Sequence, residues 1–206
     1  MANMRLQFQS NLFGTMAFTQ PFITYFREHR AGHIINISSV GSTSFTPSWA
    51  AYCATKAAMD VYSDILASEL FLFNVRVSTI LPGTFRTNIF TSHPAYVTNG
   101  QPPKVPATKI YTDPVTQGFN SINSEVDVVR PSGVVGDVEK LATRVYEVGA
   151  GVGLTQEVVE QNSRANWIRI PLGSDSGERL IGKYTDNLEN VKAFEAIWRS
   201  TDRKLE

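Results

Sequence analysis

The sequence predicts an α/β domain built on a parallel sheet. Segments with apolar residues at helical spacing alternate along the chain with short runs of β-branched residues. These runs are bounded by glycine, serine or proline, as buried strands are. Because helix and strand alternate, right-handed crossovers would bring the strands side by side in one sheet. The composition, 42% apolar and 18% charged, fits a single globular domain over residues 1–206.

The first predicted helix and strand occupy residues 10–39. Residues 10–30 have apolar side chains at helical spacing and basic residues in the last turn. We expect Pro21 to bend this helix and Gly32 to end it. Residues 33–39, HIINISS, are rich in isoleucine and predict a buried strand.

The second helix and strand repeat this order. Residues 49–73 are rich in alanine and leucine and form the longest predicted helix. Residues 75–81, VRVSTIL, predict a strand that Pro82 and Gly83 end. The first two strands are therefore expected to be parallel neighbours.

The rest of the chain begins with a long irregular stretch. Residues 84–135 are rich in prolines and turns and are expected to form a substrate-loop region within the domain. An amphipathic helix is predicted over 136–149, a last strand over 167–174, and a C-terminal helical segment over 175–200. The glycines at 147–155 follow a helix rather than a strand, so we interpret them as a flexible loop and not as a dinucleotide-binding turn.

Composition excludes several classes of function. Lysine plus arginine and aspartate plus glutamate number 19 each, so no net field attracts nucleic acid or an anionic membrane. No run of residues has the length or character of a secretory signal or a membrane span. Cys53 is the single cysteine, which fits a reducing compartment, and cytoplasmic location is the default expectation. His29, His33 and His93 do not have the spacing of a metal site.

The stretch from 35 to 58 has the residues for proton transfer at an oxygen. Tyr52 and Lys56 lie one helical turn apart, so a phenol and an ammonium can reach the same point. We expect the positive charge to lower the pKa of the phenol toward neutrality. A hydroxyl from Ser38 or Ser39, at the end of the preceding strand, could hold a carbonyl or alcohol oxygen beside it. A tyrosine and lysine at this spacing are, taken alone, more often a solvated pair.

Four motifs together resemble the short-chain dehydrogenase/reductase family. A strand ending in N-x-S-S is followed by Y-x-x-x-K, and Ser39, not Ser38, stands thirteen residues before Tyr52. The sequence NLFGT at 11–15 is similar to the helix that carries the family's asparagine, and LPGTFRT at 81–87 is similar to its P-G-x-x-x-T segment. The resemblance extends over nearly all of the chain and implies a partial Rossmann-like, doubly wound parallel sheet, the C-terminal half of the family fold.

The resemblance also implies roles for individual residues and an NAD or NADP cofactor. Tyr52 would exchange a proton with a carbonyl or secondary alcohol while the cofactor exchanges hydride, and Ser39 would orient the substrate oxygen. Lys56 would hold the nicotinamide ribose, and Asn11 would hold a water in the proton relay. The residues implied to contact the cofactor are Tyr52, Lys56, Pro82, Gly83, Thr84, Phe85 and Thr87.

The chain begins where the family's asparagine helix begins. The resemblance implies that about a hundred preceding residues are missing, including the glycine-rich pyrophosphate turn and the residue that selects NAD or NADP. A truncated gene product or incomplete gene model is therefore expected. Strand 33–39 would then have one edge without the strand that pairs with it in the family. The alternative is an inactive remnant that associates with a full-length relative. In the family, helices corresponding to 10–30 and 49–73 commonly build the oligomer interface, which predicts a homo-oligomer here.

Two further interpretations follow from particular residues. A serine hydrolase of the penicillin-binding type needs S-x-x-K, which this sequence lacks, as it lacks G-x-S-x-G. Aromatic residues flank the predicted site and would favour a moderately apolar small-molecule ketone or alcohol, although they could equally be core. They are Phe45, Trp49, Phe90 and Tyr96. Asp60 and Asp64, beyond Lys56 on the same helix, are assigned to a solvated face.

Overall fold

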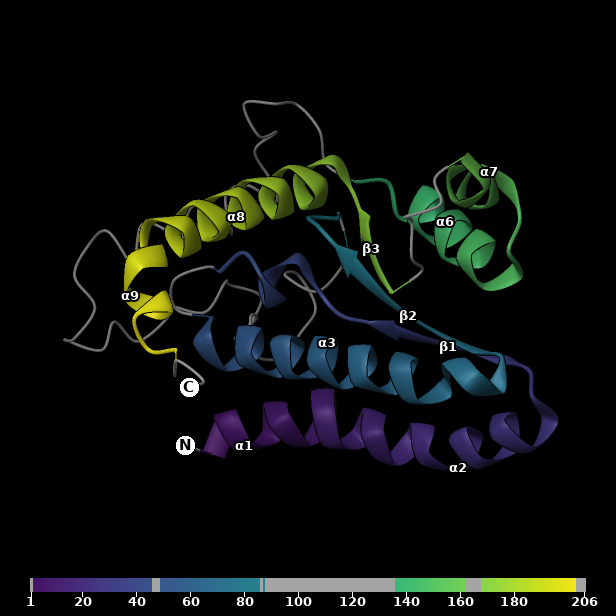
Figure 1. Ribbon diagram of the computed structural model, residues 1–206. Coiled ribbons are helices and arrows are strands. Elements are labelled where there is room, and N and C mark those ends of the chain that lie inside the picture. The colour runs from purple at the N-terminus through teal and green to yellow at the C-terminus, as the bar shows by residue number, and fades with distance from the viewer. Residues whose placement is uncertain (1, 46–48, 86, 88–135, 162–167, 203–206) are drawn as a thin grey trace.

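A three-stranded parallel sheet organises the protein. The computed structural model describes residues 2–45, 49–85, 87, 136–161 and 168–202. Strands β1 (Gly32–Ile37), β2 (Val75–Pro82) and β3 (Arg169–Leu172) lie in the order β1-β2-β3, as Figure 1 shows. Ile34 pairs with Val77 and Ile80 with Ile170. The predicted parallel α/β sheet is therefore confirmed, with strand bounds within a few residues of those predicted.

The N-terminal helix is longer than predicted. It consists of α1 (Ala2–Phe8), a π-helical turn η1 (Gln9–Phe13) and α2 (Gly14–His29), so it begins eight residues before the predicted start. Pro21 lies inside α2 and does not end it. The expected stop at Gly32 is wrong. Arg30 adopts the left-handed conformation, and its N–H bonds to the carbonyls of Phe26 and Arg27, which ends α2 before β1 begins.

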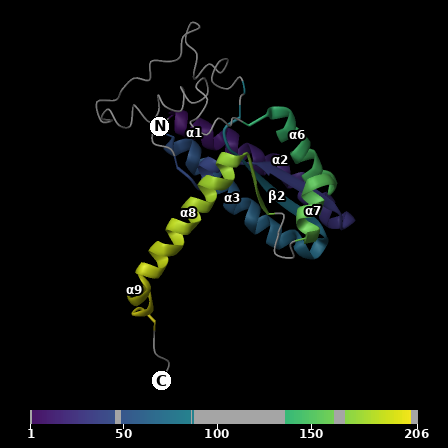
Figure 2. The ribbon, with the colours of Figure 1, turned by 90° about the horizontal axis from the view of Figure 1, so that it is seen from above.

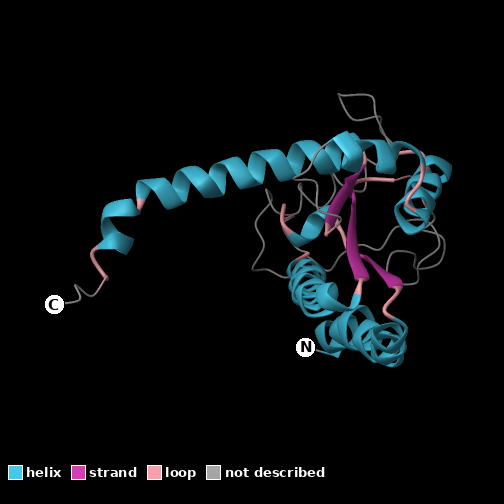
Figure 3. Ribbon diagram, turned by 45° about the vertical axis from the view of Figure 1, so that its right-hand side comes forward, coloured by secondary structure: helices cyan, strands magenta, loops and turns pink. Residues whose placement is uncertain are grey.

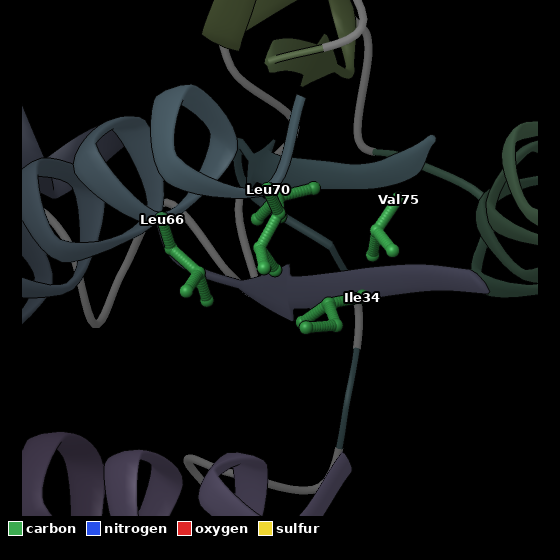
Figure 4. Packing of buried hydrophobic residues seen from close by; sticks show 5 residues of the cluster. Ile34, Leu66, Leu70 and Val75 are labelled. Carbon is green, nitrogen blue, oxygen red and sulfur yellow. The ribbon is translucent and has the colours of Figure 1, made fainter. Parts of the chain in front are cut away.

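Helix α3 (Ala50–Leu70), followed by the short helix η3 (Phe71–Phe73), covers one face of the sheet. Side chains from α3, β1 and β2 form the main core: Ile34, Leu66, Leu70, Val75 and Val77. Figure 4 shows leucines of α3 directed toward the two strands. Phe26 of α2 packs against the same cluster, so α2 and α3 lie side by side (Figures 1 and 2).

Helix α6 (Val138–Ala150) lies on the opposite face of the sheet. Ile35 points away from the core of Ile34, because neighbouring strand residues face opposite sides, and its side chain lies close to Gly149 of α6. Asp137 caps α6 by accepting bonds from the N–H groups of Glu139 and Lys140. Helices on both faces give the doubly wound arrangement that was predicted.

The glycines at 147–155 do not form the flexible loop predicted for them. Gly151, with a φ of 68°, ends α6, and its N–H bonds to the carbonyl of Glu147. Helix α7 (Gly153–Gln161) begins two residues later. The glycines thus form a tight junction between two helices, where a left-handed residue is needed to stop the first. A junction of this kind also differs from the strand, turn and helix of a dinucleotide-binding loop.

The C-terminal segment forms one long helix and one short helix. Helix α8 (Ser174–Ala193) starts directly after β3, and α9 (Glu195–Arg199) follows it. The hydroxyl of Ser176 donates to the carbonyl of Leu81 at 2.6 Å, which anchors the start of α8 to β2. Beyond this anchor α8 extends away from the sheet (Figure 3). The predicted helical segment at 175–200 is therefore confirmed.

Nearly all of the predicted substrate-loop region, 84–135, falls outside the described residues. Gly136 is described and pairs with Phe85 in an isolated bridge, so the two ends of the region meet. No helix in the described part of the chain is long and apolar enough to cross a membrane.

Candidate active site

The predicted site residues lie around the carboxyl end of β1. In an open parallel sheet, ligand sites form at the carboxyl ends of the strands. Strand β1 ends at Ile37, and Ser38 and Ser39 lead into the short helix η2 (Val40–Ser42). The first turns of α3, which carry Tyr52 and Lys56, lie against η2 and the end of β1.

The hydroxyl of Ser39 lies beside the ring of Tyr52, close enough to lower the pKa of the phenol. The Ser39 oxygen accepts the N–H of Gly41 at 3.0 Å. A β-carbon added at Gly41 would lie 3.3 Å from the Ser39 oxygen and 3.6 Å from the Tyr52 ring. Position 41 therefore has little room for a side chain. The hydroxyl of Ser38 instead donates to the carbonyl of Lys56 at 3.3 Å, so the two serines serve different partners.

The predicted lowering of the Tyr52 pKa is wrong for the ligand-free protein. Burial raises the pKa of Tyr52 above its ordinary value of 10.0, and the nearby hydroxyl of Ser39 opposes this rise only in part. The reason is that burial disfavours the phenolate more than the nearby donors favour it. Tyr52 is accordingly a protonated phenol at neutral pH, the form that donates a proton to an oxygen.

Lys56 points toward the end of β1. Its ammonium donates to the carbonyl of Ile37 at 2.8 Å and lies 5.9 Å from the centre of the Tyr52 ring. Burial lowers the pKa of Lys56, and the charge of Asp60 partly restores it. One of the three ammonium N–H groups is engaged by Ile37, and two more remain to bind an oxygen.

Asn11 approaches the site from the N-terminal helix through one intermediate residue. It lies in the π-helical turn η1, and its amide donates to the hydroxyl of Thr55 at 3.1 Å. Thr55 is fully buried and donates to the carbonyl of Tyr52 at 2.7 Å. Such π-helical turns often occur at functional positions in helices. Thr55 was not predicted, and no pattern in the sequence distinguishes it from an ordinary core threonine.

The segment after β2 is fixed by the start of α8. The N–H of Gly83 bonds to the carbonyl of Leu172 at 2.9 Å, and the N–H of Thr84 donates to the carboxylate of Asp175 at 2.8 Å. The carbonyl of Thr84 accepts the N–H of Gly136 at 3.0 Å. The Thr84 N–H is therefore engaged within the chain, so a ligand would have to compete for it. Pro82 and Phe85 are half-buried, whereas Thr87 is exposed.

The assignment of Asp60 and Asp64 to a solvated face is wrong for Asp60. This residue is 2% exposed, and burial raises the pKa of its carboxyl. Arg169 of β3 lies 3.8 Å from Asp60 and holds Asp64 through two bonds of 3.2 and 2.5 Å. The Ser38 hydroxyl lowers the Asp60 pKa without reaching hydrogen-bonding geometry. The position of Asp60, one turn after Lys56, was the only signal for this network.

Only part of the predicted aromatic lining can be placed. Trp49 contacts the ring of Tyr52 edge-on, with the ring centres 5.4 Å apart, and so forms a wall beside the phenol. Phe45 is 65% exposed, under the ammonium of Lys183. Phe90 and Tyr96 lie outside the described residues.

A cavity of about 650 Å³ runs along α2 and β1 and reaches Asn11 and Lys56. Its apolar lining includes Phe18, Phe22 and Ile37. Ser39 and Tyr52 do not line it. Among the described residues, no group of histidine, cysteine or carboxylate side chains could hold a metal ion.

Comparisons with known proteins find similar sequences among short chain dehydrogenases and oxidoreductases. The family model for short chain dehydrogenases matches residues 2–96. An uncharacterised oxidoreductase of Bacillus subtilis, YusZ, is 33% identical over 92 residues, which are 45% of this chain and 33% of the relative. Estradiol 17-beta-dehydrogenase 2 of Mus musculus is 43% identical over 79 residues, 38% of this chain and 20% of that protein. The chain therefore matches a third or less of the length of these relatives.

A solved structure extends the likeness to the rest of the fold. A short-chain dehydrogenase from Streptomyces avermitilis superposes with a TM-score of 0.67 at 25% identity, over 97% of this chain and 64% of the other. This likeness confirms a Rossmann-like fold. The match at residues 2–96 includes Asn11, Ser39, Tyr52 and Lys56. Together, the motifs, the family match and the fold assign residues 2–96 to the short-chain dehydrogenase/reductase family.

Proposed function

We propose that the chain carries the proton-transfer and substrate-orienting half of an NAD(P)-dependent oxidoreductase site that interconverts a carbonyl and a secondary alcohol. The observation that carries the proposal is that the Ser39 hydroxyl lies beside the Tyr52 ring, since both border the same point next to Gly41, with the Lys56 ammonium one turn along the helix from Tyr52. The hydroxyl, the phenol and the ammonium thus all lie near the carboxyl ends of parallel strands, where the fold places ligands.

In the direction of reduction, Tyr52 donates its phenolic proton to the substrate oxygen. The raised pKa of Tyr52 keeps the phenol protonated at neutral pH, ready to donate. The Ser39 hydroxyl, which lies beside the phenol, holds the same oxygen. The indole of Trp49 packs against one side of the phenol. For oxidation of an alcohol the proton moves in the opposite direction.

The residues present fit one side of a nicotinamide cofactor, which when bound supplies or accepts the hydride. Lys56 has ammonium N–H groups left for ribose hydroxyls. The segment of Pro82, Gly83, Thr84, Phe85 and Thr87 stands at the neighbouring strand end and would contact the carboxamide. The Thr84 N–H is bound to Asp175, so we expect the other backbone groups of the segment and the Thr87 hydroxyl to contribute more.

The same proposal assigns Asn11 to the proton relay. Its amide is tied to Thr55, which is tied to the carbonyl of Tyr52. This chain of bonds sets the position of α1–α2 relative to the first turns of α3. The carbonyl oxygen of the Asn11 side chain is left to accept a bond from water. We further propose a moderately apolar substrate, because Trp49 lies beside the phenol.

Carbonyl reduction by the purified chain tests the proposal. A panel of ketones is offered with NADH and NADPH, and turnover is followed by nicotinamide fluorescence. Tyr52→Phe should lower kcat by a factor of about 10² to 10⁴. Tyr62→Phe, on the same helix but packed against the main core, is the matched control and should change kcat little. Full activity of Tyr52→Phe would refute the proposed proton donor.

A second candidate function is association without catalysis. It is favoured by the exposed apolar side chains on α2 and α3, among which Phe18 is 72%, Tyr25 54% and Ile65 54% exposed. These lie on the helices predicted to form a homo-oligomer. Saturable enhancement of nicotinamide fluorescence would support the enzyme, whereas no binding of either cofactor together with self-association would support this second function.

A further inference from the structure

The C-terminal helices present an apolar face that the body of the protein leaves uncovered. The start of α8 is fixed to the body, because Leu180 is buried against Val40 and Leu81 and Arg179 binds Ser44 at 2.8 and 3.1 Å. One turn after Leu180 the hydroxyl of Tyr184 still accepts a bond of 3.5 Å from Arg169 of β3. The rest of α8 extends past the sheet, as Figures 2 and 3 show. The anchored start of α8 thus fixes the direction in which the rest of the helix projects.

The exposed side chains continue the side of α8 that is buried at its start. At about 100° per residue, Tyr184, Val191 and Phe194 lie within about 40° of Leu180 around the helix. The large apolar residues of α8 and α9 and their exposed fractions are Ile181 70%, Tyr184 47%, Leu188 54%, Val191 54%, Phe194 51%, Ile197 62% and Trp198 42%. We call these seven residues the C-terminal apolar face.

Part of this face has the spacing of a helix–helix seam. Ile181, Tyr184, Leu188 and Val191 are separated by three, four and three residues, the a and d positions of two heptads. Trp198 folds back toward the same region, and its indole N–H donates to the carbonyl of Val191 at 3.1 Å. Because its donor is engaged, the indole offers a partner mainly apolar surface.

We infer that this face pairs with the same face of a second copy of the chain, in an antiparallel arrangement that crosses near Val191. A two-fold axis there places Val191 opposite its own copy and Leu188 opposite Phe194 of the other chain. One patch then serves both partners, as a closed two-fold dimer requires. The antiparallel direction also keeps the two bodies at opposite ends of the helix pair, where they do not collide.

The area of the face suits such a dimer. Seven side chains of roughly 200 Å² each, about half exposed, would bury roughly 700 Å² per copy. Two copies would bury about 1,400 Å², within the range of about 1,200 to 2,000 Å² for specific interfaces. The face is therefore large enough for association without help from another surface.

The charges on the two helices favour a second copy over an anionic lipid surface. Residues 174–199 contain five acidic and four basic side chains. Arg199 pairs with Glu195 and Lys192 with Glu189 within the helices, so half of the basic side chains are already neutralised. Two such helices neither repel one another strongly nor attract acidic headgroups, which bind clusters of unpaired basic residues.

Sedimentation equilibrium of the purified chain tests this inference. The 22.8 kDa chain should sediment as a species of twice that mass and dissociate on dilution. The double variant Leu188→Asp/Val191→Asp should raise the dissociation constant at least about 100-fold, because it places charges in the middle of the seam. Ala193→Asp is the matched control. It adds one such charge on the opposite side of α8 and should leave the dissociation constant unchanged. Circular dichroism checks that each variant keeps its helices.

Cross-linking supplies a second and independent measurement. Val191→Cys should form a disulfide-linked dimer under mild oxidation, whereas Ala193→Cys should not, and the native Cys53 is buried. A monomer at every concentration would overturn the inference. The C-terminal apolar face would then have to be covered by another segment of the same chain. A dimer that survives Leu188→Asp/Val191→Asp but is lost in Phe18→Asp would assign the interface to α2 instead. Binding of the monomer to vesicles of anionic phospholipid that Leu188→Asp/Val191→Asp abolishes would also overturn it.

Discussion

Arg169→Met should destabilise the protein mainly by leaving Asp60 without a counterion. The pair of Arg169 with Asp64 is partly exposed, 32% and 37%, so solvent screening limits it to about 1 kcal/mol. Asp60 is 2% exposed, and its carboxylate oxygens lack hydrogen-bond partners in the described structure. Removing the charge 3.8 Å away should add about 2 kcal/mol. The total loss in free energy of unfolding at pH 7 is therefore about 3 kcal/mol.

The loss should depend on pH in a direction that burial sets. The pKa of Asp60 is already raised in the folded protein, and loss of Arg169 raises it further. The folded variant then binds a proton that the unfolded chain releases, so its stability relative to the parent improves as pH falls toward the ordinary carboxyl pKa. The deficit should be full at pH 7 and much smaller near pH 4, where a protonated Asp60 needs no counterion.

Urea denaturation measures both effects. With a slope of about 2 kcal/mol/M, the midpoint at pH 7 should fall by about 1.5 M. The control is Arg169→Met in an Asp60→Asn background, where the neutral amide needs no counterion and only the screened contribution of Asp64 should be lost. A deficit that is equal at pH 4 and pH 7, or equal in the two backgrounds, would refute the role assigned to Asp60.

Three further predictions concern stability. Burial and the charge of Arg76 lower the pKa of His33 to about 4. The free energy of unfolding should therefore fall by about 1 to 3 kcal/mol as pH drops from 6.5 to 4. In urea titrations, His33→Gln should flatten this pH dependence, whereas His29→Gln should not. In the same assay, Leu70→Ala should lower the free energy of unfolding by about 2 to 5 kcal/mol. Leu72→Ala, at a position that is 75% exposed, should lower it by less than about 0.5 kcal/mol. Equal losses would contradict the assigned core. A β-carbon at Gly83 would meet the carboxylate of Asp175, so Gly83→Ala should lower the melting temperature, whereas Gly177→Ala, with open space around it, should not.

The sequence predicted the strands and central helices well because their patterns are local. Alternation of helix and β-branched runs was enough for the parallel sheet, and helix 49–73 matches α3 and η3. The start of the first helix was missed because apolar and polar residues alternate over residues 2–9, which is the spacing of a strand. The end of this helix at Arg30 was missed because arginine, unlike glycine, gives no sign in the sequence that it will adopt the left-handed conformation.

The sequence proposes the site as a set of residues but does not contain their interactions. The spacing of thirteen residues favoured Ser39 over Ser38, and in the structure Ser39 lies beside the Tyr52 ring. The sign of the Tyr52 pKa shift depends on burial, which the sequence does not contain. The network of Asp60 joins residues far apart in the chain, so no local pattern could reveal it. The catalytic roles themselves remain predictions.

The bond between Asp64 and Arg169 spans 105 positions of the chain, which has a consequence for the order of folding. Closing so long a loop is slow, and contacts of this kind form late. As synthesis proceeds from the N-terminus, α3 emerges well before β3. The helix that carries Tyr52 and Lys56 therefore leaves the ribosome with an acidic side chain whose partner has yet to be translated.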